Sequence, residues 1–185
     1  MQRCLIKIAD LFNRNEVIWA LGASMLLHYK GLIAKPNDID LVVSLKDAEK
    51  ADGLLCGEGL RHPPYSDDVH YSTKYFHEYL IDGREVDLMA GFAINHPGGA
   101  YEYKLDPAAL ESFFVEDTEI PLCPMEDWFV IYMLMPGREN RVKSVEGYLK
   151  ENRCNLARLQ FWLGEDIPDP AMSRIESFIA QYRGP

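Results

Sequence analysis

Two aspartates one residue apart, Asp38 and Asp40, open the apolar stretch DIDLVV. Side chains alternate between the two faces of a β-strand, so both carboxylates project to one side while Ile39 points to the other. Two carboxylates about 4 to 6 Å apart repel each other unless a cation lies between them. Because an all-oxygen site favours Mg²⁺ or Mn²⁺, we predict a divalent metal site at this pair.

A third carboxylate is expected on a neighbouring strand. Asp87 lies in EVDLM, shortly after Asp82-Gly83, and an Asp-Gly pair between two strand-like runs is the strongest short hairpin signal in a sequence. Glu85 shares the face of Asp87 by the two-residue period and is the alternative third acid. A solvated or salt-bridged neighbour is the simpler interpretation of Glu85, so Asp87 is the predicted ligand.

The segment Gly22-Ala23-Ser24 interrupts the apolar run before these aspartates. A strand that ends in glycine lets a phosphate approach the backbone, and the first N–H groups of a following helix donate to such an anion. Ser24 is expected at the N-cap of that helix. Alone it would be no more than a cap, but beside a metal site the segment predicts phosphate binding at Gly22 and Ser24.

The elements that position these residues follow from periodicity and turn signals. We predict helices over the first dozen residues, 25–31, 45–57, from Pro124 onward, 139–151, 154–164 and 170–182. Strands are predicted at 17–22, 38–43, 70–81, 84–92 and, as a short pair, within 112–122. Residues 61–69 read as a turn-rich loop, and residues 95–107 as a mobile surface loop suited to be a lid.

Composition limits the functional class. The chain has 185 residues, 48% of them hydrophobic, as in an ordinary single globular domain. Nineteen basic and 29 acidic residues give a net charge of −10, which disfavours nucleic-acid binding without a partner. The four cysteines are scattered and predict neither disulfides nor a zinc site. With apolar runs too short for a membrane span, a cytoplasmic protein with no membrane association is expected.

The ordered combination of LGAS, DIDLVV beginning 14 residues after Ser24, and EVDLM resembles the nucleotidyltransferase superfamily related to DNA polymerase beta. The closer resemblance is to its small bacterial and archaeal branch, which includes AbiEii toxin-like and antibiotic nucleotidyltransferase-like proteins. In that branch a helical tail with a phrase like PMEDWFVIYMLMPGR follows the sheet. The resemblance covers about residues 15 to 150.

The resemblance implies an α/β (α+β) nucleotidyltransferase fold, with a mixed, mostly antiparallel sheet flanked by helices. Residues 1–123 would form the core and residues 124–185 a helical extension packed on it. Gly22 and Ser24 would hold nucleotide phosphates. Apart from the resemblance, Arg138 lies in a basic cluster after the helix that is predicted from Pro124 onward and is a candidate for a further nucleotide contact; the alternative is that it bonds helix-end carbonyls or acidic neighbours. Asp38, Asp40 and Asp87 would be the catalytic residues and ligands of Mg²⁺ or Mn²⁺. The family pattern here is Gly-small-Ser, and Ala23 in place of glycine is a mild departure from it.

The implied reaction moves a nucleoside monophosphate from a nucleoside triphosphate to a hydroxyl and releases pyrophosphate. Antibiotic, protein side chain and RNA end are all open as the acceptor. The alternative is a non-catalytic nucleotide-sensing or partner-binding module, such as one component of a toxin–antitoxin pair with a protein partner. Retention of all three acids favours catalysis, because an idle member can lose them at little cost in stability.

Overall fold

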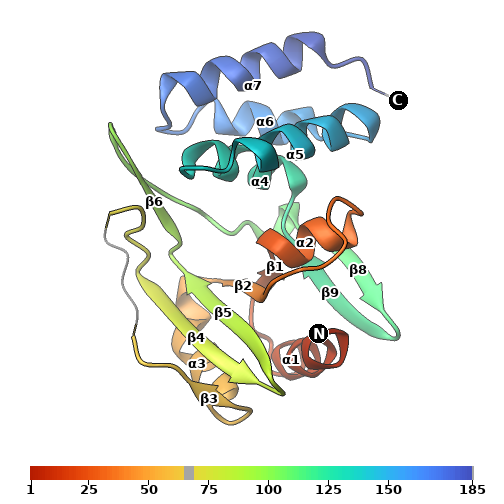
Figure 1. The fold of residues 1–185 in the computed structure, drawn as a ribbon, viewed down its shortest axis with the longest axis vertical. Helices are drawn as coiled ribbons and strands as arrows, with labels where there is room; N and C mark the ends of the chain where they lie inside the picture. The colour runs from red at the N-terminus through yellow and green to blue at the C-terminus, as the bar shows by residue number, and fades with distance from the viewer. Residues whose placement is uncertain (65–68, 185) are drawn as a thin grey trace. The chain divides into compact units, whose positions relative to one another are not determined.

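The computed structural model describes residues 1–64 and 69–184, which form two compact units (Figure 1). The sheet unit comprises residues 1–64, 73–93 and 102–123, and the helical unit comprises residues 69–72, 94–101 and 124–184. Residues 65–68 of the predicted loop at 61–69 lie outside the described residues. No helix among the described residues combines the length and the apolar character that a membrane crossing requires.

A seven-stranded mixed sheet organises the sheet unit, in the order β3-β4-β5-β2-β1-β9-β8. The β2–β5 and β1–β9 pairs are parallel, and the other four pairs are antiparallel. The mostly antiparallel sheet expected from the sequence is therefore confirmed. The strands are β1 (Trp19–Leu21), β2 (Ile39–Val43), β3 (Leu60–Arg61), β4 (Tyr75–Ile81), β5 (Arg84–Ala90), β8 (Glu111–Val115) and β9 (Thr118–Leu122).

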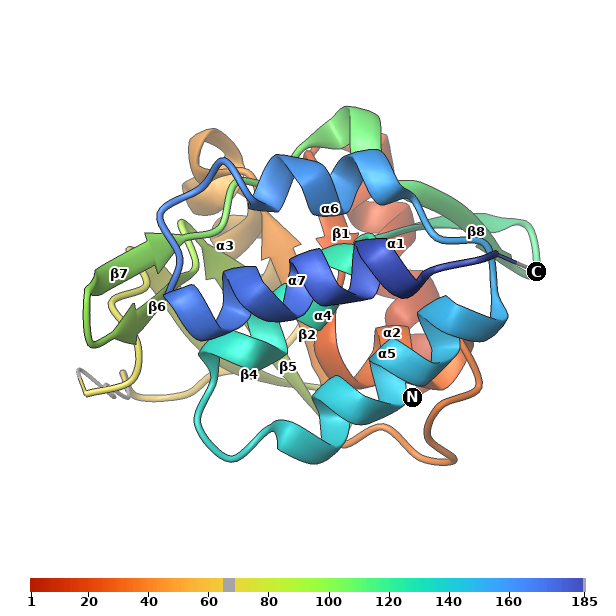
Figure 2. The ribbon, with the colours of Figure 1, turned by 90° about the horizontal axis from the view of Figure 1, so that it is seen from above.

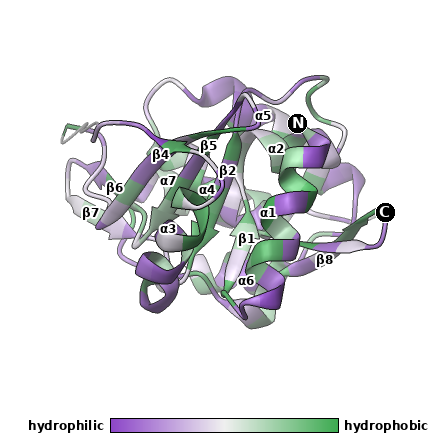
Figure 3. Cartoon of the chain, turned by 90° about the horizontal axis from the view of Figure 1, so that it is seen from below, coloured by the Kyte–Doolittle hydropathy of each residue, from purple (hydrophilic) through white to green (hydrophobic). Residues whose placement is uncertain are grey.

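The middle of this sheet is apolar and buried. Every residue of β1 and of β2 is buried, and β2 and β5 carry mostly hydrophobic residues (Figure 3). Strands covered on both faces lose the simple alternation of polar and apolar residues, so the polar Asp40 inside β2 is exceptional. The helical segments of the unit are α1 (Gln2–Arg14), α2 (Ala23–Tyr29), the 3₁₀ turns η1 (Leu45–Asp47) and η2 (Pro107–Ala109), and α3 (Ala48–Cys56).

Helix α1 buries one face, as the spacing of its apolar residues predicts. Leu5, Ile8, Ala9 and Phe12 are all fully buried. These positions recur every three or four residues and so form one stripe along a helix. The ring of Phe12 meets that of Trp19 in β1 edge-on, with centroids 5.7 Å apart, which ties the helix to the sheet.

The β4–β5 hairpin forms at the predicted turn. Asp82 and Gly83 have φ angles of 51° and 69°, and a two-residue turn with positive φ at both positions matches the twist of the strands that it joins. The turn fixes the register by pairing Ile81 with Arg84. Counting outward along both strands then places Glu78 opposite Asp87.

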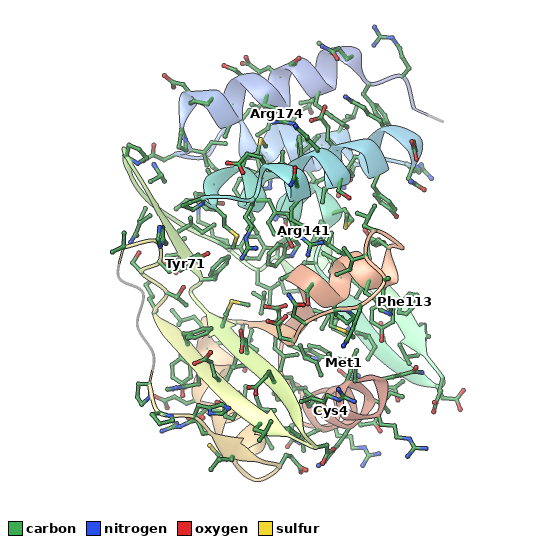
Figure 4. The ribbon with its side chains drawn as sticks, in the orientation of Figure 1. Met1, Cys4, Tyr71, Phe113, Arg141 and Arg174 are labelled. Atoms are coloured by element: carbon green, nitrogen blue, oxygen red, sulfur yellow. The ribbon has the colours of Figure 1, made fainter. Side chains whose placement is uncertain are left out.

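The helical unit contains α4 (Met125–Leu134), α5 (Glu139–Glu151), α6 (Leu156–Trp162) and α7 (Asp169–Gln181). Helix α4 contacts the other three helices, which lie around it when seen from above (Figure 2). Nearly every residue of this apolar helix is buried. Arg174 of α7 lies toward α5 (Figure 4) and donates to Glu146 of that helix from Nε, at 3.1 Å, and from Nη2.

A buried ion pair joins the first turn of α4 to α6. Arg158 donates from Nε to Asp127 Oδ1 at 2.6 Å and from Nη2 to Asp127 Oδ2 at 2.8 Å. The indole N–H of Trp162 also donates to Asp127 Oδ1, at 2.8 Å. Asp127 is fully buried, so these bonds compensate for the water that its carboxylate has lost.

Two predictions for this part of the chain need correction. The predicted surface loop at 95–107 contains a hairpin of β6 (Ala93–His96) and β7 (Gly99–Glu102), and it buries Tyr101 and Tyr103. Its mobility stays a prediction. Helix α4 begins at Met125, so Pro124 is its N-cap rather than its first helical residue. The division at residue 123 stays a proposal, to which the structure adds that residues 69–72 and 94–101 group with the helices.

Candidate active site

The turn between β1 and α2 places Gly22 and Ser24 beside the start of β2. The backbone N–H of Gly22 donates to the carbonyl oxygen of Asp40 at 3.0 Å, and the carbonyl of Gly22 accepts from the N–H of Leu26 at 3.1 Å. Gly22 is thus the N-cap of α2, and the prediction that Ser24 is the cap is wrong. Ser24 lies inside the first turn of the helix, where its side chain is free to bond outside it.

Ala23 carries the backbone strain of this turn. Its φ of 39° lies in the left-handed region, where the Cβ of an L-residue crowds the following carbonyl. Gly22 has an extended φ of −121°, which any residue adopts. The conformational freedom of glycine would therefore help at position 23, and strained backbone of this kind clusters at binding and active sites.

The structure brings together the three predicted carboxylates. Asp38 immediately precedes β2, while Asp40 and Asp87 are register partners on the parallel strands β2 and β5. One carboxylate oxygen from each of the three lies within 4.8 Å of the others. Asp40 is buried and the other two are half-buried. This separation is that of ligands around one ion, and three carboxylates are a donor set suited to Mg²⁺ or Mn²⁺.

Mutual repulsion and burial raise the pKa values of two of these acids. Burial raises the pKa of Asp40 well above its usual range, and the charges of Asp38 and Asp87 add to the effect. For Asp87, burial and the charges of Asp38, Glu78 and Glu85 raise the pKa to about 7. At neutral pH the protein itself therefore offers little positive charge or hydrogen bonding to offset the negative charge of these two carboxylates, as expected of a cation site.

Glu78 is a neighbour of the site that the sequence analysis did not identify. It lies half-buried on β4, directly opposite Asp87, and its charge contributes to the raised pKa of that residue. The Asp82-Gly83 turn contained the signal, because counting four residues outward from it pairs these two positions. Glu85, the alternative third acid, is exposed, and its Oε2 atom lies 3.2 Å from Nε2 of His62. The group of three carboxylates does not include it.

The other predicted site residue lies elsewhere in the chain. Arg138 belongs to the helical unit, where it is exposed and forms the N-cap of α5. Its contact with a nucleotide stays a prediction.

Comparison with known proteins gives a likeness in structure rather than in sequence. The chain matches no protein-family model, and no curated protein is significantly similar to it. A solved structure from Thermotoga maritima, assigned as a nucleotidyltransferase, superposes with a TM-score of 0.63 at 21% identity, covering 80% of this chain and 91% of that one. This chain has the nucleotidyltransferase fold.

Two antibiotic-modifying proteins share that fold. The antibiotic-resistance factor ANT(2'')-Ia has a TM-score of 0.56 at 9% identity, with coverage of 97% of this chain and 92% of its own. The lincosamide antibiotic adenylyltransferase LnuA, solved with lincomycin bound, has a TM-score of 0.53 at 18% identity, with coverage of 80% and 98%. The assignment to the AbiEii-like branch stays a prediction.

Proposed function

We propose that this protein is a metal-dependent nucleotidyltransferase that moves a nucleoside monophosphate from a nucleoside triphosphate to a hydroxyl. The acceptor oxygen forms a bond to the α-phosphorus. The bond between that phosphorus and the oxygen that bridges it to the β-phosphorus breaks, and pyrophosphate leaves. The observation that carries the proposal is the convergence of Asp38, Asp40 and Asp87 within 4.8 Å. In a fold shared with adenylyltransferases, three poorly compensated carboxylates are best explained as ligands of a divalent cation.

Each residue has a role in this scheme. Asp38 and Asp40 hold Mg²⁺ or Mn²⁺, and Asp87 completes the set and accepts the proton of the acceptor hydroxyl. When bound, the metal neutralises charge that develops on the attacking and leaving oxygens. Ser24 binds the phosphates, Gly22 lets them approach the backbone closely, and Arg138 is a candidate for a further phosphate contact.

The structural neighbours favour a small-molecule acceptor. ANT(2'')-Ia has been solved in complex with adenylyl-2''-tobramycin, and LnuA with lincomycin, so proteins of this fold transfer to or bind antibiotics. The net charge of −10 argues against an RNA end as acceptor, because a phosphate backbone is repelled at long range. We therefore rank a small hydroxyl compound first and a protein side chain second.

The test is transfer of label from a nucleoside triphosphate. The protein is incubated with α-³²P-labelled triphosphates, Mg²⁺ and a cell extract, and we expect a labelled acceptor together with pyrophosphate. A γ-labelled triphosphate is the matched control, because its label should leave with pyrophosphate. Asp40→Asn should abolish both signals. Metal-dependent nucleotide binding without transfer would instead support the nucleotide-sensing alternative, and absence of nucleotide binding would contradict both functions.

A further inference from the structure

The donors of Ser24, assigned above to the phosphates, are already engaged by the carboxylates of the metal site. The hydroxyl of Ser24 donates to Asp38 Oδ1 at 2.9 Å. Its backbone N–H donates to Asp40 Oδ2 at 3.3 Å. The same hydroxyl oxygen accepts from the backbone N–H of Asn37 at 3.3 Å. Ser24 is only 8% exposed, so these partners replace water around it.

These bonds compete with a phosphate. A serine hydroxyl carries one proton and a backbone amide carries one, so neither group makes full hydrogen bonds to a carboxylate and to a phosphate at the same time. Phosphate binding at Ser24 therefore takes a donor away from Asp38 and another from Asp40. Both carboxylates lie in a cluster of like charge, where a lost donor is costly unless a cation replaces it.

We propose that Ser24 couples metal binding to nucleotide binding, by donating to Asp38 and Asp40 before the metal binds and to a nucleotide phosphate afterwards. The proposal rests on the proposed function. A cation bound to the carboxylates compensates their charge and frees the hydroxyl and the amide for the phosphate. The metal thus binds before or together with the nucleotide. This coupling adds to any direct contact between metal and phosphate.

The proposal predicts an unusual sign for one substitution. Ser24→Ala removes the hydroxyl that stabilises Asp38 without metal, so Mn²⁺ alone should bind about 10-fold more tightly, the effect of one hydrogen bond to a charged group. Binding of ATP at saturating Mn²⁺ should weaken by a similar factor of about 10, because the phosphate loses its donor. If Ser24 contacted the phosphate alone, Mn²⁺ affinity would not change. If it only oriented Asp38, Mn²⁺ affinity would fall.

Ser44 supplies a matched control. Its hydroxyl donates to Asp47 Oδ2 at 2.6 Å, so the pair has the same chemistry and lies in the same unit. Ser44 follows the end of β2, whereas Asp38 precedes its start, so the control pair is remote from the metal ligands along that strand. Ser44→Ala should leave the affinities for Mn²⁺ and ATP unchanged.

The experiment measures Mn²⁺ binding by electron paramagnetic resonance of the free ion, without nucleotide, for the parent, Ser24→Ala and Ser44→Ala. ATP binding is then measured by calorimetry at saturating Mn²⁺. A parent that binds neither ligand overturns the proposed function. A parent that binds both, with Ser24→Ala showing unchanged or weaker Mn²⁺ binding, overturns the coupling alone.

A second measurement does not depend on how well the variant folds. In the parent, addition of Mg²⁺ alone should move the amide proton resonance of Ser24 upfield, because a cation on Asp40 weakens the hydrogen bond that this carboxylate accepts from the amide. A downfield shift, or no shift at saturating Mg²⁺, overturns the coupling.

Discussion

Replacing Asp87 by asparagine should stabilise the protein, by an amount that grows with pH. The pKa of Asp87 is raised from 3.8 to about 7 by burial and by the charges of Asp38, Glu78 and Glu85. A carboxyl group whose pKa is raised on folding does not destabilise the fold at pH values below its unfolded pKa. The destabilisation grows as the pH rises from the unfolded pKa to the folded pKa, and it is complete above the folded pKa. Asparagine keeps the shape of the side chain without the charge.

The size of the effect follows from linkage. One pKa unit corresponds to about 1.36 kcal/mol, so the raised pKa of Asp87 costs the fold roughly 1.6 kcal/mol at pH 5, where the folded carboxyl stays protonated, and up to about 4 kcal/mol at pH 8, where it is ionised. The stability advantage of Asp87→Asn should therefore increase by about 2 to 3 kcal/mol between these pH values. The assay is urea unfolding followed by tryptophan fluorescence, with a chelator present at both pH values.

Asp52 provides a control of opposite sign. Burial raises its pKa, but hydrogen bonds from Tyr79 and Tyr75, and from Arg61, outweigh this effect and lower the pKa to about 2. Asp52 is ionised in both folded and unfolded protein between pH 5 and 8, so Asp52→Asn should be less stable than the parent by an amount that does not vary with pH. An advantage of Asp87→Asn that stays constant with pH, or a loss of stability at pH 8, would refute the electrostatic account of the site.

Three further experiments test the turn at Ala23, the buried ion pair of Asp127 and the metal site at Asp40. Ala23→Gly should raise stability in urea unfolding by about 0.5 to 1 kcal/mol, because glycine adopts the left-handed φ of 39° freely; a loss would show that residue 23 is unstrained. Asp127→Asn should lower stability in the same assay by about 3 to 5 kcal/mol, because it removes the carboxylate that pairs with the buried Arg158 guanidinium; a loss below 1 kcal/mol would contradict the ion pair. Mg²⁺ with ATP should raise the melting temperature of the parent but not of Asp40→Asn, since a ligand stabilises only the state that it binds; equal shifts in a thermal-shift assay would place the ligand elsewhere.

Local patterns predicted most of the elements that carry the site. Asp82-Gly83 both located the β4–β5 hairpin and fixed its register, because a two-residue turn leaves one way to pair the strands. The period of two in DIDLVV placed Asp38 and Asp40 on one face. The parallel pairing of β2 with β5, which brings Asp40 opposite Asp87, joins segments far apart in the chain. The need of a metal site for a third carboxylate predicted that Asp87 lies on a neighbouring strand, but no sequence pattern predicted the parallel pairing.

The remaining features depend on tertiary context. The short β6 and β7 strands have too few residues to show a period, and Pro97, Gly98 and Gly99 between and within them indicate only a turn. Serine is a residue type typical of a helix N-cap, yet Gly22 occupies that position. The hydroxyl of Ser24 donates to the carboxylate of Asp38 instead. No local signal distinguishes these two arrangements, because the partner lies 14 residues along the chain.

The most direct test of the metal site is anomalous diffraction from crystals grown with Mn²⁺ and a triphosphate that carries a methylene bridge between its α- and β-phosphorus atoms. The bridge prevents transfer, so the bound state persists. We expect a manganese peak in contact with the carboxylates of Asp38, Asp40 and Asp87, with a phosphate oxygen within hydrogen-bonding distance of Ser24. Manganese and triphosphate bound elsewhere, with the three carboxylates making no contact to the ion, would contradict the proposed active site.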